Sequence, residues 1–232
     1  MTFDIPIEVD PRPCGVCGGK RDGWHCPTCH DRAERRDRRQ KLHLATREFV
    51  SSLPDWMTWA RLGSPEFAEK CSLPELRKFA ATYHPRDSSV VASALTGVGK
   101  TTGLVALAHR ALDEAKQLGD LDHWIVRAVW TTGHDLASAR REHRLGAGEA
   151  PLIAAAKRAS VLFLDELGFE PPSEAPFEVV DVRDRARLPT LVTTGLRIDP
   201  DPSGQSLRQK YGDALVRRLL ERGSRIEGWK RG

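Results

Sequence analysis

The sequence lacks any apolar run that approaches the ~20 residues needed by a membrane-spanning helix. Residues 1–10 are acidic and do not have the basic and apolar regions of a signal peptide. These absences argue against a membrane protein and predict a cytoplasmic protein with no membrane partner. With 232 residues, 29% of them charged and 40% apolar, the chain can bury one sizeable core and a small appendage, but hardly two full domains.

A strong excess of either charge is also missing, since the formal net charge is +4. The basic residues are nevertheless unevenly distributed. Residues 207–232 contain eight Lys/Arg against three Asp/Glu, and residues 31–50 contain seven against four. Each basic segment is either a solvated face or a contact for a polyanion, and charge alone leaves both readings open.

Cysteine is scarce, and four of the five cysteines form the pattern C-x2-C-x8-C-x2-C, namely Cys14, Cys17, Cys26 and Cys29. Two disulfides are not expected in a cytosolic protein. Two C-x2-C pairs can instead form knuckles that together supply four thiolates to a tetrahedral Zn²⁺. His25 and His30 could substitute, but four cysteines already fill the coordination shell. The fifth cysteine, Cys71, stands alone and is expected to be a small buried hydrophobe.

Apolar side chains are also rare around these cysteines, with Val16 and Trp24 the main ones. Metal binding would therefore supply most of the folding free energy of this module. Such a module either docks on protein or nucleic acid, or serves only to stabilise the structure of the N-terminal region. Glycine and proline are absent from residues 31–50, which predicts a charged, exposed helix after the module.

Pro54 ends this helix, and an apolar patch follows, made of Trp56, Met57, Trp59, Leu62 and Phe67. A short helix is expected at about residues 74–83. The aromatic residues of the patch either pack in the core or flank an adenine ring, and the sequence leaves both roles open for Trp56 and Trp59.

The motif A-L-T-G-V-G-K-T-T at residues 94–102 follows a small apolar stretch, residues 88–93, that predicts a buried strand. In a P-loop, N–H groups at a helix N-terminus surround the β-phosphate, a lysine reaches the β- and γ-phosphates, and a hydroxyl holds Mg²⁺. Lys100 and Thr101 match the last two roles. Ala94 replaces the first glycine of G-x4-G-K-[ST], a minor departure. The expected ATP-binding residues are Thr96, Gly97, Val98, Gly99, Lys100, Thr101 and Thr102.

A second apolar run, residues 161–164, leads directly into Asp165 and Glu166. In P-loop enzymes the first such carboxylate holds the nucleotide's Mg²⁺, and the second polarises the attacking water. The pair of motifs therefore predicts an ATPase in which Thr101 and Asp165 bind Mg²⁺. Glu166 and Lys100 are the expected catalytic residues.

Further strands are predicted at residues 124–130 and 188–194, and helices at residues 104–118, 135–160 (broken near 146–151), 177–187 and 213–222. Alternating strands and helices with apolar strand cores predict an α/β fold. Its parallel sheet would be covered by helices on both faces, with ligand at the carboxyl ends of the strands. The predicted domains are a zinc module with a basic helical linker, residues 1–48, and an ATPase domain, residues 49–232.

The order of these segments resembles the DnaC/IstB-like branch of the AAA+ ATPases, and most closely its helicase loaders, over about residues 53–231. The likeness rests on six segments in order. They are L-P-D-W-M-T-W, T-G-V-G-K-T, T-T-G-H-D-L, V-L-F-L-D-E-L-G, L-P-T-L-V-T-T-G-L, and Y-G-D-A-L-V-R-R-L-L with a basic tail. The resemblance implies an AAA+ domain without a C-terminal helical lid. It also implies an N-terminal element that binds the helicase.

The resemblance also implies residue roles. Thr194, or its neighbour Thr193, would read the γ-phosphate, although the family usually has Asn where this chain has Gly195. Arg218, with Arg217 as its rival, matches the arginine that members point into a neighbour's ATP site. A residue acting in trans requires an oligomer, expected to form on ATP binding.

Three functions agree with these features. The first is a replicative helicase loader that uses ATP, Mg²⁺ and Zn²⁺ and has a replicative helicase and single-stranded DNA as partners. The second is an IstB-like ATPase helper of DNA transposition. The third is an adaptor that binds ATP with little hydrolysis, a reading favoured by Ala94 and Gly195 and opposed by the intact Lys100, Asp165 and Glu166.

Overall fold

A computed structural model describes residues 13–20, 26–86, 88–144, 146–202 and 204–229. Trp24, His25 and the last basic residues of the tail lie outside these ranges. The chain divides into two compact units, Met1–Leu44 and Ala45–Gly232. In the described residues, no helix is both long enough and apolar enough to cross a bilayer.

Helix α1 (Pro27–Ser52) begins in the first unit, directly after Cys26, and ends in the second. The predicted charged helix is therefore present, and it includes Cys29 in its first turn. Residues 31–41 are exposed on every side of the helix. A helix that is polar all round is not held by an apolar stripe and depends on its own side-chain pairs and on solvation.

The second unit is built on a sheet of five parallel strands in the order β2-β3-β4-β1-β5. The strands are β1 (Ser89–Ala94), β2 (Val129–Thr132), β3 (Leu162–Asp165), β4 (Thr190–Thr194) and β5 (Gly223–Gly228). The predicted parallel α/β fold is confirmed. Because β4 pairs with both β1 and β3, its carboxyl end lies between the segments that follow those two strands.

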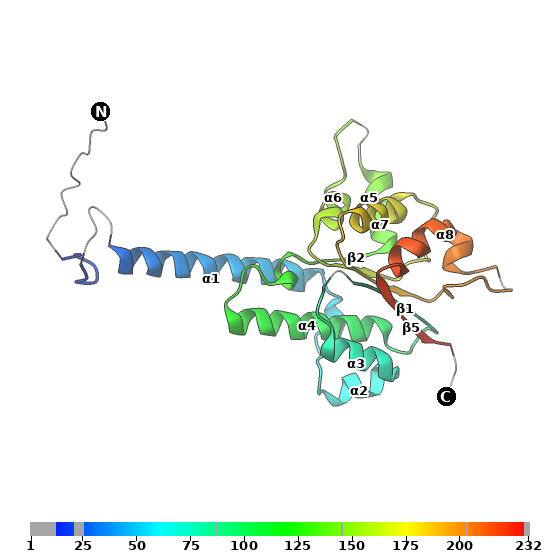
Figure 1. Ribbon diagram of the computed structural model, residues 1–232, viewed down its shortest axis with the longest axis horizontal. Coiled ribbons are helices and arrows are strands. Elements are labelled where there is room, and N and C mark those ends of the chain that lie inside the picture. The colour runs from blue at the N-terminus through cyan, green and yellow to red at the C-terminus, as the bar shows by residue number, and fades with distance from the viewer. Residues whose placement is uncertain (1–12, 21–25, 87, 145, 203, 230–232) are drawn as a thin grey trace. The chain divides into compact units, whose positions relative to one another are not determined.

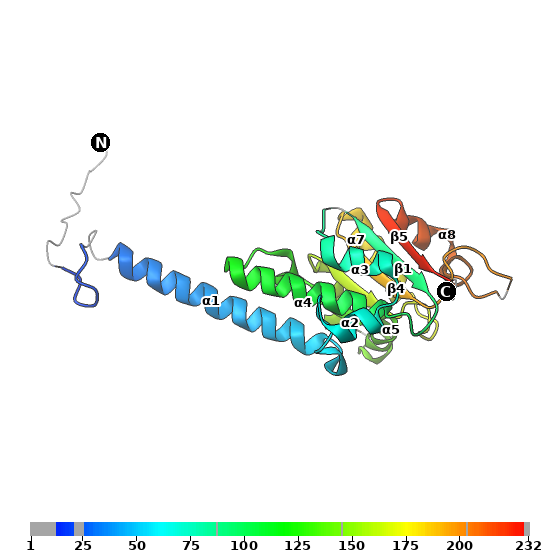
Figure 2. The same ribbon diagram turned by 90° about the horizontal axis from the view of Figure 1, so that it is seen from below.

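Helices cover both faces of the sheet (Figures 1 and 2). Helices α2 (Pro65–Lys70), α3 (Pro74–Thr82) and α4 (Lys100–Leu118) pack in one core with Val90 and Ala92 of β1. Helices α5 (Gly133–Glu142), α6 (Pro151–Arg158), α7 (Ala175–Arg185) and α8 (Leu207–Leu220) pack in the other core with Val91. Alternate residues of β1 thus point into opposite cores, as a strand buried on both faces requires.

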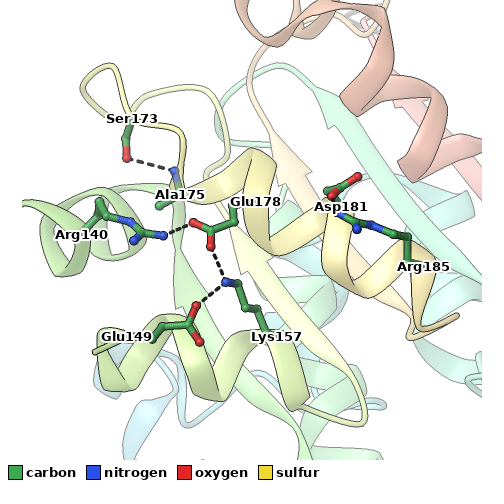
Figure 3. Close-up of polar contacts among 8 residues, drawn as sticks. All are labelled: Arg140, Glu149, Lys157, Ser173, Ala175, Glu178, Asp181 and Arg185. Atoms are coloured by element: carbon green, nitrogen blue, oxygen red, sulfur yellow. Dashed lines mark hydrogen bonds and ion pairs between the residues drawn. The ribbon is translucent and has the colours of Figure 1, made fainter. Parts of the chain in front are cut away.

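An ion-pair cluster joins three helices on the second face (Figure 3). Glu178 of α7 accepts from Arg140 of α5 and from Lys157 of α6, and Lys157 also pairs with Glu149 just before α6. Lys157 is largely covered by the surrounding atoms, with 13% of its side chain exposed. The cluster therefore fixes α5, α6 and α7 relative to one another at their polar edge.

Two sequence predictions were wrong. Trp124–Arg127 forms a 3-10 turn, not the start of a strand, and β2 begins only at Val129. In this turn Ile125 is buried while Trp124 and Val126 are half-buried against the same core, a placement that the alternating sides of a strand would not allow. The second error is β5, which pairs along the whole of β1 although its sequence was read as a basic tail.

Several bounds also differ. Helix α8 starts at Leu207, earlier than residue 213, because Ser206 caps it by accepting from the backbone N–H of Gln209. Gly212 breaks the helical path inside it with φ of 79°. Two short turns complete the elements, a 3-10 turn at Asp55–Met57 and the one at Trp124–Arg127. Within the described residues no helix follows β5.

Candidate nucleotide site and cysteine cluster

The loop between β1 and α4 has the backbone of a phosphate cradle. Gly97 and Gly99 both have left-handed φ angles, 87° and 84°, and Gly99 is the N-cap of α4. A Cβ at Gly99 would lie 2.2 Å from the carbonyl oxygen of Lys70, so only glycine fits there. The N-terminus of a 19-residue helix, with its free N–H groups, is therefore presented at the carboxyl edge of the sheet.

Lys100 is the first residue of α4, and its ammonium group lies inside the cradle. Its Nζ donates to the carbonyl oxygens of Ala94 and Leu95, at 2.8 Å each. Burial lowers the pKa of Lys100, and the nearby carboxylates of Asp165 and Glu166 oppose that change. An anion placed in the cradle would meet a half-buried cation that now donates to neutral carbonyls.

A cluster of two hydroxyls and a carboxylate lies beside the cradle. Asp165, at the end of β3, accepts hydrogen bonds through Oδ1 from Thr101 (3.0 Å) and from Thr193 of β4. Burial raises the pKa of Asp165, while the two hydroxyl donors lower it. A buried carboxylate with no cationic side chain among these hydrogen-bond partners gains stability when a cation joins it.

Glu166 has a left-handed backbone, with φ of 54°, which is uncommon for a residue other than glycine. Its N–H donates to Thr193 Oγ1 at 3.0 Å, and the next N–H, of Leu167, donates to the Thr193 carbonyl at 2.9 Å. Thr193 thus holds both the Asp165 carboxylate and the Glu166 backbone. Such a strained conformation fixed by neighbours is typical of functional sites.

The two threonines at the end of β4 have different partners. Thr193 contacts Asp165 and Glu166, whereas Thr194 Oγ1 accepts from the Leu196 N–H at 3.0 Å. Both are buried. Sequence reasoning named Thr194 first and Thr193 second for reading the phosphate, and the hydrogen bonds bring Thr193 to the carboxylates.

A hollow of about 440 Å³ opens over the cradle. Of the predicted ATP-binding residues, Thr96, Gly97, Gly99, Lys100, Thr101 and Thr102 line it, together with Glu166, Thr193 and Thr194. Val98 is not among the lining residues, and its carbonyl accepts from the Ser72 N–H at 3.1 Å. Asp165 lies beneath the lining, is buried, and accepts a hydrogen bond from Thr101.

Aromatic residues line the remaining wall of the hollow. Trp56, Trp59 and Phe169 are among its lining residues, and Trp56 is 68% exposed. Core packing alone therefore does not describe Trp56, and a flat ring could stack there. Lys70 and Phe169 also line the hollow, although no motif in the sequence points to either of them.

Phe169 covers the position at which the family usually has Asn. A Cβ at Gly195 would lie 2.7 Å from Phe169 Cζ. A side chain at residue 195 and the ring in its observed place exclude each other. An apolar ring therefore stands where the resemblance would have put an amide.

These residues fit Mg²⁺ and a nucleoside triphosphate. A glycine-built helix N-terminus with a buried lysine suits phosphate, and a hydroxyl 3.0 Å from a buried carboxylate suits a magnesium ion that keeps most of its waters. This fit is judged from the chemical type of the groups that would contact the nucleotide and Mg²⁺ and from their positions along the chain. The assignment of these residues to ATP and Mg²⁺ remains a prediction.

The two arginines of α8 also differ. Arg218 Nε lies 2.7 Å from Asp181 of α7, and its guanidinium lies 5.3 Å from the centre of the Phe177 ring. Asp181 is also paired with Arg185, as Figure 3 shows. Arg217 is exposed, lines an open surface hollow on α8, and has no ion pair among the described residues. Arg218, the first choice from the sequence, is thus held within its own chain.

The four cysteines of the first unit lie close together. Their sulfurs are all within 4.8 Å of one another, with Cys14–Cys29 at 3.6 Å and Cys17–Cys26 at 3.4 Å. A tetrahedral zinc with Zn–S bonds of about 2.3 Å separates its sulfurs by about 3.8 Å. Backbone N–H groups of Val16 and Cys17 lower the pKa of Cys14 to about 6, while the neighbouring Cys17 and Cys14 side chains raise the pKa of Cys29. The predicted cysteine cluster is confirmed as a geometry that fits zinc.

No family model matches the sequence, and no curated protein matches it either. Among solved structures, the chain is similar to the DnaC helicase loader, with a TM-score of 0.54, 21% identity, and coverage of 75% of this chain and 99% of that one. It is also similar to a candidate primosome component of Streptococcus pyogenes serotype M3, with a TM-score of 0.50, 21% identity, and coverage of 78% and 93%. The fold of this chain is therefore similar to that of the DnaC helicase loader, as its motifs predicted.

Proposed function

We propose that this protein is an ATP-dependent DNA replication factor that binds a replicative helicase and loads it onto single-stranded DNA. The observation that carries the proposal is the match to nearly the full length of the DnaC helicase loader, combined with P-loop residues that line a hollow at the carboxyl edge of the sheet. We expect the protein in the cytoplasm, where such a helicase is loaded.

The nucleotide chemistry would be divided among residues that already lie together. Lys100 would neutralise the β- and γ-phosphates, and Thr101 and Asp165 would hold Mg²⁺. Mg²⁺, when bound, would stabilise negative charge on the phosphates. Glu166 would orient and deprotonate the attacking water. Thr193 would hold Asp165 and Glu166 in fixed positions relative to each other through its two hydrogen bonds.

Hydrolysis would be completed in an oligomer. An arginine supplied by a neighbouring protomer can stabilise charge that develops on the transferred phosphoryl group. Arg217 suits this role better than Arg218, because its guanidinium is exposed while that of Arg218 is paired with Asp181. ATP binding would thereby favour assembly.

The cysteine module would hold the helicase. Zinc would order a segment with little apolar surface, and such modules commonly present a rigid docking surface rather than perform chemistry. Loss of the metal should then remove helicase binding and leave ATP binding by the second unit intact.

The test is a loading assay on closed circular single-stranded DNA, with a replicative helicase from the same host. We expect the protein with Mg²⁺·ATP to increase the amount of helicase retained on the circle. Glu166→Gln should keep ATP binding and lose turnover, because the amide cannot take up a proton. If Glu166→Gln hydrolyses ATP at the wild-type rate, Glu166 is not the base.

The alternative of an ATP-binding adaptor has one specific observation behind it, the Phe169 ring in place of an amide at residue 195. Wild-type protein that binds ATP and shows no turnover with helicase and DNA present would favour the adaptor. Stimulation by duplex DNA and a transposase, with no effect on helicase retention, would favour the transposition helper.

A further inference from the structure

The part of α1 within the first unit carries most of its arginines on one side. At about 100° per residue, Arg32, Arg36, Arg39 and His43 fall within an arc of about 60°, and Arg35 flanks that arc. The acidic residues Asp31, Glu34 and Asp37 lie outside it, on the other side, together with Arg38 and Lys41. All of these residues are exposed. We call the residues within this arc, Arg32, Arg36, Arg39 and His43, the arginine face.

This arrangement works against the helix itself. The arginines of this face have like-charged neighbours three or four positions away, as in Arg32–Arg36 and Arg36–Arg39, and such pairs destabilise a helix. Successive side chains are about 6 Å apart along the axis, within the ~8 Å screening length at physiological salt. Among the described residues, no ion pair engages Arg32, Arg36 or Arg39. A ligand that neutralised the face would stabilise the helix.

The acids have a different environment. Glu34 has Arg38 four positions on, and Asp37 has Lys41 four positions on, the orientation that stabilises a helix. One side of α1 thus has the alternating charges of an ordinary solvated surface, and the other does not. The excess of basic residues seen in the sequence of residues 31–50 is therefore concentrated on one face of α1.

We infer that the arginine face binds the phosphate backbone of a nucleic acid. It extends for about 16 Å from Arg32 to His43, a length over which one strand of a B-form duplex carries four or five phosphates, at about 3.4 Å each. Its charged residues are all arginines, and a guanidinium can bind a phosphate with two parallel hydrogen bonds.

Nucleic acid is favoured over an acidic protein surface because the arginine face has no apolar centre. Between Arg32 and His43 the large apolar side chain is Leu42, which lies beyond Arg35 and is buried, whereas Gln40 lies beside the other edge of the arc. Protein interfaces have a buried apolar or aromatic core, whereas phosphate contacts need only cations and polar donors. Nucleic-acid binding by this face does not depend on the nucleotide site or on the loader function.

The test compares two double variants of the full-length protein that remove equal charge from opposite sides of the same helix segment. Arg36→Ala/Arg39→Ala removes two residues of the arginine face, and Arg38→Ala/Lys41→Ala is the matched control. Alanine favours helix, so both variants should keep the helical circular dichroism and the zinc content of the wild type. Binding is measured without ATP by fluorescence anisotropy, using a labelled oligodeoxythymidine strand and a duplex of the same length.

We expect the first variant to bind DNA about tenfold or more weakly than the wild type, and the control to change little. On the single strand, the slope of log K against log salt should fall by about 0.7 for each phosphate that the variant no longer neutralises. Equal weakening of DNA binding in both variants, or no weakening in either, would overturn the inference. So would a wild-type protein that binds a poly-glutamate peptide as tightly as DNA, with the same dependence on Arg36 and Arg39. Weaker DNA binding with helicase loading unchanged would support the inference and leave the proposed function in place.

Discussion

Thr193 has a position that its neighbour Thr194 does not share. Its hydroxyl contacts the Asp165 carboxylate and receives the Glu166 N–H, so a single oxygen connects the expected magnesium ligand to the expected base. The sequence showed two threonines at the end of an apolar strand, and Thr194 was ranked first, although the partners of each threonine depend on the register between β4 and β3. The pairing of Leu162 with Thr190 and of Leu164 with Val192 settles that register.

Thr193→Val should therefore reduce ATP turnover by about tenfold or more, because it removes a hydrogen-bonding group that fixes both carboxylate residues. Valine has nearly the same shape, so the sheet should be preserved. The matched change Thr194→Val, which removes only the bond to the Leu196 N–H, should stay within about threefold of wild-type turnover. Steady-state hydrolysis and ATP affinity, measured on both variants, check the prediction. A larger loss of turnover in Thr194→Val than in Thr193→Val would contradict the assignment.

Arg183 shows how elements are joined away from the site. It is fully buried on α7, and its guanidinium donates to the carbonyl oxygens of Ala156, Ala159 and Pro189 and to Thr190 Oγ1. The first two carbonyls belong to the C-terminal end of α6, where four carbonyls lack helical partners. Arg183 thus ties α6 and the start of β4 to α7.

Arg183→Met should lower the free energy of unfolding by about 3 kcal/mol or more, because it leaves several buried carbonyls without donors. Arg185→Met, on the same helix, removes an arginine that is 72% exposed and should cost no more than about 1 kcal/mol. Urea denaturation followed by circular dichroism compares the two. Similar midpoints for both variants would show that the buried hydrogen bonds contribute little.

Element prediction succeeded where apolar residues form long or strongly periodic runs, as in β1, β3 and α4. It failed at β5, where Ile226 is the buried apolar side chain and the ends are glycines. Those glycines are needed because a Cβ at Gly223 would lie 2.3 Å from the Leu219 carbonyl, and one at Gly228 would lie 2.4 Å from Leu73. Such packing is a property of the folded chain. The Phe169–Gly195 contact was invisible in the sequence for the same reason.

At the scale of the whole molecule, a single protomer is expected to be incomplete as an ATPase. Arg217→Ala should retain folding and ATP binding and lose most turnover, whereas Arg218→Ala should mainly lower stability by breaking the pair with Asp181. A mixture of Arg217→Ala and Glu166→Gln protomers should regain activity, because a mixed interface joins an intact Glu166 to an intact Arg217. No recovery in the mixture, with assembly shown by light scattering, would rule out action in trans.

The central claim is that the protein holds a replicative helicase through its cysteine module, and size-exclusion chromatography with light scattering tests it most directly. The full-length protein is mixed with the replicative helicase of its host and Mg²⁺·ATP. We expect a complex of defined mass that is absent with Cys14→Ser/Cys17→Ser, while that variant still binds ATP. Absence of a complex with an active helicase would contradict the loader function, and a complex that survives the cysteine changes would remove the cysteine module as its docking site.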